Sequence, residues 1–127
     1  MLRLRRLEIE DFGPYKGIQE FRLSDADGVM VVYGENRRGK TSLLNAIRFA
    51  LLGQVVTRGS RPLQFQKVLN TVARAEGCSG FRVALDFTFG GHAYALTRRA
   101  DLRAGATEPL RHDDFKPRLF LTRDGQA

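Results

Sequence analysis

The residue types best suited to chemistry gather in one octapeptide, Gly34-Glu35-Asn36-Arg37-Arg38-Gly39-Lys40-Thr41. It fits the spacing G-x-x-x-x-G-K-[ST], in which glycines let successive backbone N–H groups converge on phosphate oxygens. In that chemistry Lys40 reaches the β- and γ-phosphates, and the Thr41 hydroxyl completes the coordination of Mg²⁺. The pattern therefore predicts a site for a nucleoside triphosphate and Mg²⁺.

The predicted binding residues extend from this loop into the helix that should follow it. Lys40 is the residue expected to act in catalysis, and Thr41 is the expected metal ligand. Ser42 adds a further donor in the first helical turn. The complete predicted set is Gly34, Asn36, Arg37, Arg38, Gly39, Lys40, Thr41 and Ser42.

The segments on either side of the loop are of the kind that position a phosphate site. Val29–Tyr33 is apolar without alternation, which predicts a strand buried on both faces of an α/β sheet. Thr41–Leu52 predicts an amphipathic helix, and Gly53 suits the position just after its end. The apolar residues at helical spacing are Leu43, Leu44, Ile47, Ala50 and Leu51. Strand, glycine loop and helix in this order favour phosphate binding.

Alternating residues predict two strands before this unit. Leu7 and Ile9 alternate with charged residues, and a change of phase upstream predicts a bulge near Arg5. Asp11-Phe12-Gly13-Pro14 ends the first strand, because Gly-Pro cannot continue a ladder. Gln19–Leu23 is then expected to return as a second strand.

The second half of the chain predicts an antiparallel hairpin. Phe81–Phe89 alternates apolar and polar residues, Gly90-Gly91 supplies a two-residue turn, and a partner strand runs through Tyr94 toward Arg99. The flanks are less regular. They comprise one short helix within Leu63–Ala75 with Val68, Leu69 and Val72 on one face, an irregular stretch at Ala100–Pro117 and a short strand at Arg118–Thr122.

The positive charge of the chain is concentrated around the predicted loop. The 127 residues contain 21 Lys and Arg against 14 Asp and Glu, a formal charge of +7. Eight basic residues and no acidic residue lie between Asn36 and Ala75, which leaves 13 basic and 14 acidic residues elsewhere. The concentration predicts an anionic ligand. Arg58, Arg61, Lys67 and Arg74 are candidates for contact with a DNA backbone, although solvated surface charges fit these residues equally well.

Length and composition indicate one globular domain. A single cysteine, Cys78, excludes an internal disulfide framework and suits a reducing compartment. The apolar runs are too short for a membrane span, and the residues after Met1 form no signal-peptide pattern. A cytoplasmic protein that does not interact with membranes is the expectation.

Taken together, these residues resemble the N-terminal lobe of the SMC/RecF-type, ABC-like ATPases, which include SbcC and DndD. Leu7–Tyr15 is similar to the family's opening strand and turn, Gly34–Thr41 to its phosphate loop, and Phe81–Arg99 to its β-hairpin. Three positions depart from the family, with Asp11 in place of the usual Asn, Arg37 in place of the usual Gly and Arg38 where a small residue is common. If position 37 needs a positive φ, an arginine there would be strained by roughly 1–2 kcal/mol.

The resemblance implies an α/β fold, the P-loop half-domain called lobe I of an ABC-like head, with an antiparallel meander and a phosphate-loop helix. Residues 1–127 are then the N-terminal lobe of such a head, with the coiled coil and C-terminal lobe outside them. It implies ATP and Mg²⁺ as cofactors and ATP-driven dimerisation of heads. The implied partners are a C-terminal lobe or second head of the same protein, DNA, and a nuclease or modification-system subunit.

Hydrolysis needs residues that this stretch does not supply. No apolar strand ending in Asp or Asp-Glu follows the loop, and no signature motif is evident. The chain alone is therefore expected to bind nucleotide weakly and not to hydrolyse it efficiently. Two alternatives remain open, a different small P-loop kinase or GTPase and a nucleic-acid-binding module in which the loop is incidental.

Overall fold

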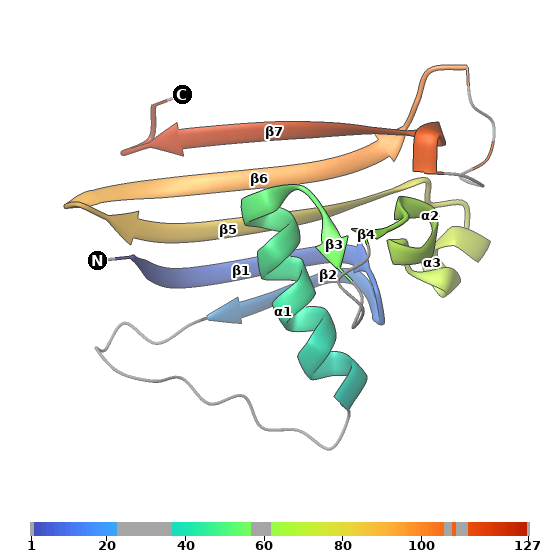
Figure 1. The fold of residues 1–127 in the computed structure, drawn as a ribbon, viewed down its shortest axis with the longest axis horizontal. Coiled ribbons are helices and arrows are strands. Elements are labelled where there is room, and N and C mark those ends of the chain that lie inside the picture. Colours follow the sequence, from blue (N-terminus) through green and yellow to red (C-terminus); the bar gives the residue numbers. More distant parts are fainter. Residues whose placement is uncertain (1, 23–36, 57–61, 106–107, 109–111, 127) are drawn as a thin grey trace.

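The computed structural model describes residues 2–22, 37–56, 62–105, 108 and 112–126. Five antiparallel strands in the order β2-β1-β5-β6-β7 form the main sheet (Figure 1). Their bounds are β1 Arg3–Phe12, β2 Tyr15–Arg22, β5 Gly80–Phe89, β6 His92–Leu102 and β7 Phe115–Arg123. The strand predicted at Val29–Tyr33 lies outside the described residues, so the described sheet is the antiparallel part of the predicted α/β lobe.

One long helix and several short elements accompany the sheet. Helix α1, Arg37–Leu52, crosses one face of it (Figure 1). The other elements are β3 Val55–Val56 paired with β4 Pro62–Leu63, helices α2 Phe65–Val68 and α3 Thr71–Ala75, and a 3-10 turn at His112–Asp114. No helix in the described part of the chain is long and apolar enough to cross a membrane.

The predicted hairpin is confirmed. Phe89 pairs with His92 across Gly90 and Gly91, whose φ angles of 59° and 81° suit the mirror-image turns of two-residue hairpins. The bulge predicted near Arg5 is also present, as a shift of register between Leu4 and Arg6. This shift places the later residues of β1 in the phase that buries Leu7 and Ile9.

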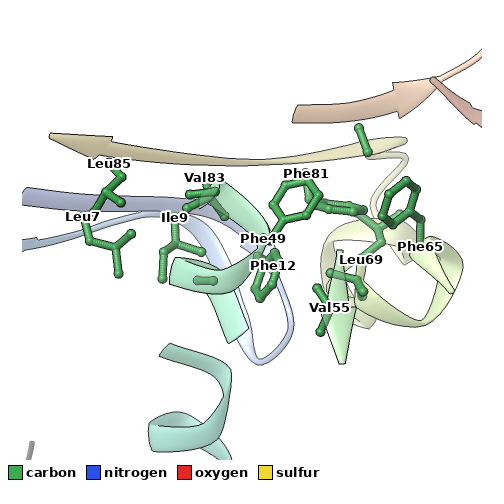
Figure 2. Close-up of a cluster of buried hydrophobic side chains, with 14 of the residues drawn as sticks. Leu7, Ile9, Phe12, Phe49, Val55, Phe65, Leu69, Phe81, Val83 and Leu85 are labelled. Carbon is green, nitrogen blue, oxygen red and sulfur yellow. The ribbon is translucent and has the colours of Figure 1, made fainter. Parts of the chain in front are cut away.

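The core lies between the sheet and α1 and is dominated by aromatic rings. Phe49 of α1 packs against Phe12 and Phe81, with ring centroids 5.9 and 5.2 Å apart. Figure 2 shows these rings together with Leu7, Ile9, Val83 and Leu85 from the sheet. Phe65 and Phe115 extend the cluster toward the end of the sheet where α2 and α3 lie.

The buried face of α1 overlaps only part of the predicted stripe, because Ala50 is buried and Ile47 packs against the core. Ala46, Phe49 and Ala50 are fully buried against the sheet. Leu44 and Leu51 of the predicted stripe are 60% and 40% exposed. The reason is that α1 has apolar residues on two faces, and spacing alone does not show which face meets the antiparallel sheet.

Four further expectations need correction in their bounds or burial. The second strand starts at Tyr15 rather than Gln19, and the stretch predicted to be irregular overlaps two strands, because Ala100 is buried in β6 and Phe115 in β7. The single helix predicted in Leu63–Ala75 is two helices, and Val72 is 53% exposed. Phe89, the last residue of the alternating strand, is also 53% exposed.

Candidate functional site: the first turns of helix α1

Six of the eight predicted nucleotide-binding residues are the first six residues of α1. They are Arg37, Arg38, Gly39, Lys40, Thr41 and Ser42. Gly34 and Asn36 lie outside the described residues. The helix therefore begins four residues before the predicted start at Thr41, and five of the eight residues of the octapeptide are helical. As a helical residue Arg37 has a negative φ, so the strain that a positive φ would impose does not arise.

The beginning of α1 is an unusually positive helix terminus. The first N–H groups of a helix have no partner within the helix, and the aligned peptide dipoles place a partial positive charge there. The first turn of α1 contains no acidic residue, whereas Arg37, Arg38 and Lys40 each add a positive charge. Cations at this end oppose the dipole, so an anion bound at the terminus would relieve an unfavourable charge distribution.

The second half of α1 fixes the helix on the sheet. Phe49 contacts the aromatic core, and Gly53 ends the helix with a φ of 79° and an N–H bond of 2.8 Å to the Phe49 carbonyl. In Figure 1 the first turns of α1 project beyond the β2 edge of the sheet. The buried half thus holds the helix while its positive end extends away from the core.

Arg98 of β6 contacts the C-terminal end of α1 from the sheet. Its Nε donates a hydrogen bond of 3.1 Å to the Ala50 carbonyl, one of the carbonyls left open at a helix C-terminus. Partial burial lowers the pKa of Arg98. Gly53 leaves room for this contact, because a Cβ there would lie 2.7 Å from Arg98 Nη1. The sequence contains the signal, an arginine on a core-facing strand position, but periodicity alone gives it no role.

A second structural link joins the β1–β2 turn to the short helices. Asp11 adopts a φ of 54°, which Asp and Asn tolerate better than other non-glycine residues, and its Oδ1 accepts the Gly17 N–H at 2.7 Å. Buried Asn70 caps α3 by accepting the Ala73 N–H and also donates to the Gly13 carbonyl, both at 2.9 Å. Because Asn is a favoured N-cap residue, Asn70 is the sequence signal that could have separated the two helices.

The candidate DNA-binding residues are only partly described. Lys67 is exposed at the end of α2, and Arg74 is half-buried on α3. Arg58 and Arg61 lie outside the described residues. The structure therefore places two of the four on neighbouring short helices at one end of the sheet (Figure 1).

Comparison with known proteins identifies the family. Residues 6–111 match the family described as AAA domain, which is most of the chain. Arcadin-4 of Pyrobaculum calidifontis is 28% identical over 118 residues, covering 93% of this chain and 14% of that protein. The DNA double-strand break repair Rad50 ATPase of Thermoplasma acidophilum is 32% identical over 77 residues, covering 61% and 8%.

The third relative comes from DNA replication and repair. The protein RecF of Shewanella piezotolerans is 40% identical over 74 residues, covering 58% of this chain and 19% of that protein. The chain thus spans less than a fifth of each of these relatives.

The chain belongs to the AAA domain family. Within it, the likeness to Rad50, RecF and Arcadin-4 makes the chain an N-terminal ATPase lobe of the SMC/RecF/SbcC type.

Proposed function

We propose that this lobe binds the phosphates of Mg²⁺–ATP at the start of α1, in a head that acts on DNA during repair. The observation that carries the proposal is the positive charge at the beginning of α1, whose first turn has three basic residues and no acidic residue. Rad50 and RecF, the relatives named for DNA repair, support the choice of repair over DNA modification.

The residues at this terminus fit a triphosphate and a magnesium ion. Lys40 would contact the β- and γ-phosphates and neutralise charge, and the Thr41 hydroxyl would ligate Mg²⁺. Gly34, Asn36, Gly39 and the open N–H groups of the first turn would bind phosphate oxygens, with Ser42 as a further donor. The bound ion would neutralise part of the negative charge on the phosphates. The carboxylates that position an attacking water would come from outside residues 1–127.

The exposed face of α1 supports a partner in the same protein. Leu44, Leu51 and Leu52 are 60%, 40% and 67% exposed, on a helix whose other face is buried. Exposed apolar side chains gathered on one element mark contact surfaces. We assign this face to the C-terminal lobe of the head, with ATP driving association with a second head in the cytoplasm.

DNA is the proposed macromolecular substrate. Lys67, Arg74 and the two candidates Arg58 and Arg61 would contact phosphates without reading sequence. A nuclease subunit that cuts the bound DNA would suit such a head.

Isothermal titration with Mg²⁺–ATP tests the proposal. Lys40→Ala should weaken binding at least tenfold, because it removes the cation nearest the phosphates. Lys67→Ala is the matched control, with the same loss of charge on α2, away from the first turns of α1 (Figure 1), and should bind as the parent chain does. Equal binding by the parent and Lys40→Ala would refute the site. DNA binding by a parent chain that shows no measurable Mg²⁺–ATP binding would favour the nucleic-acid-binding alternative.

A further inference from the structure

The face of the sheet turned away from α1 carries charged residues in rows across the strands. The strand registers align Glu10, Arg82, Arg99 and Arg118 from β1 through β5 and β6 to β7. Because directly opposed residues of antiparallel strands project to the same side, these side chains share one face. Leu7, Ile9, Val83 and Leu85 occupy the other face and form the core.

On the β1 and β2 side of this open face the acidic residues are paired. Glu8 forms ion pairs with Arg6 and Arg82, and Glu10 lies 3.2 Å from Arg82. Glu20 and Asp86 both contact Arg6, at 3.0 and 3.4 Å. Each of these four carboxylates therefore contacts an arginine, and Arg6 and Arg82 are shared among them.

On the β7 side of the open face, positive side chains outnumber negative ones. Asp101 is held by Arg99 through two hydrogen bonds of 2.8 and 3.2 Å. Lys116 stands opposite Asp101 and Arg118 opposite Arg99. Both are exposed, and neither has an ion pair within the described part of the chain. This edge of the open face therefore has a net positive charge.

An exposed aromatic ring continues the same line. Phe120 is 53% exposed and follows Lys116 and Arg118 at every second position of β7. Alternate residues of a strand lie on one face, roughly 7 Å apart along it. Its neighbour across the strands is Thr97, a small residue that leaves the ring face open. Two exposed cations and one exposed ring thus form a row, which we call the β7 row.

The geometry points to the β7 row as a binding site for single-stranded nucleic acid. Spaced cations suit successive phosphates, and an exposed ring on a sheet offers a platform for an unstacked base. A duplex would use the cations but not the ring, because its bases are already stacked. The inference deepens the proposed function and rests on its nucleic-acid partner, but the site is separate from the nucleotide-binding end of α1.

Fluorescence anisotropy with a labelled oligothymidylate of about 15 nucleotides, without ATP, tests the inference. Lys116→Ala/Arg118→Ala should weaken binding at least tenfold at about 50 mM salt. It should also reduce the slope of log K against log salt by about 1.4, since each phosphate contact on a single strand contributes about 0.7. Phe120→Leu should weaken binding roughly tenfold and leave the slope unchanged, because stacking involves no counterions.

Matched variants distinguish binding at the β7 row from a general effect of positive charge and from binding at the proposed ATP site. Arg22→Ala/Arg48→Ala removes the same charge from exposed positions on the opposite edge and on α1, and should change affinity less than twofold. Lys40→Ala should bind the oligonucleotide as the parent chain does. The inference is overturned if the parent chain does not bind, if the two double variants behave alike, or if Phe120→Leu has no effect and a duplex binds as well as the single strand.

Discussion

Replacing Arg98 with methionine should loosen the C-terminal end of α1. Methionine keeps an unbranched apolar stem but removes the 3.1 Å bond to the Ala50 carbonyl and a positive charge at a helix C-terminus. A hydrogen bond from a charged group contributes about 1.5–3 kcal/mol, and a helix-end charge about 0.3–1 kcal/mol. Partial burial, which lowers the pKa of Arg98, offsets some of this gain. The expected net loss of unfolding free energy is about 1–2 kcal/mol.

Urea unfolding followed by circular dichroism measures this loss. With an m-value of about 1.5–2 kcal/mol/M, the midpoint should fall by about 0.5–1.3 M. Arg99→Met is the matched control on the next residue of β6, where an exposed pair with Asp101 contributes less than about 1 kcal/mol. A midpoint for Arg98→Met that equals the one for Arg99→Met would refute the role assigned to Arg98.

Three further substitutions test the fold that carries the site. Phe49→Ala should cost about 3–5 kcal/mol in urea unfolding, since it empties the centre of the aromatic cluster, and a loss below 1 kcal/mol would contradict the packing. Asn70→Ala should cost about 1–3 kcal/mol, because it removes the α3 cap and a buried bond to the β1–β2 turn. Arg82 lowers the pKa of Glu8, so their pairing stabilises the fold above the unfolded-state pKa of about 4.3 and is lost as the pH falls through the lower folded-state value. The urea midpoint should therefore drop on acidification below about pH 4, and Arg82→Met should shrink that drop.

The strands were predictable from sequence wherever alternation and turn chemistry agreed. Phe81–Phe89 with Gly90-Gly91 is confirmed as a hairpin because the period of two and the glycine turn specify one register. The bulge at Arg5 was equally predictable, since a change of phase in the apolar pattern requires one extra residue in the strand.

The features of the fold that could not be predicted from the sequence depend on contacts between elements. The two apolar faces of α1 look alike in periodicity, and only the sheet decides that Phe49 is buried while Leu51 is left exposed. Pro117 is the reason why the last strand was predicted to start at Arg118, whereas β7 starts at Phe115. The Arg123 N–H points away from β6, because it donates to the Gln126 carbonyl. Pro117 is an even number of residues away, so the N–H that proline lacks would also point away from β6, where no strand partner is needed.

The nucleotide-binding role of the octapeptide stays a prediction. A helix after the loop was predictable from the apolar spacing, but its start is at Arg37 rather than the predicted Thr41. The anchoring contact of Arg98 joins residues 48 positions apart, so the local sequence pattern does not show which carbonyl this arginine contacts.

Hydrogen exchange with and without Mg²⁺–ATP is the most direct test of the central claim that phosphate binds at the start of α1. The open N–H groups of a helix N-terminus exchange readily unless an anion accepts their hydrogen bonds. We predict that nucleotide slows exchange in residues 37–42 of the parent chain, that Lys40→Ala abolishes this protection, and that β6 and β7 are unaffected. Protection confined to other elements, or equal protection in Lys40→Ala, would contradict the account.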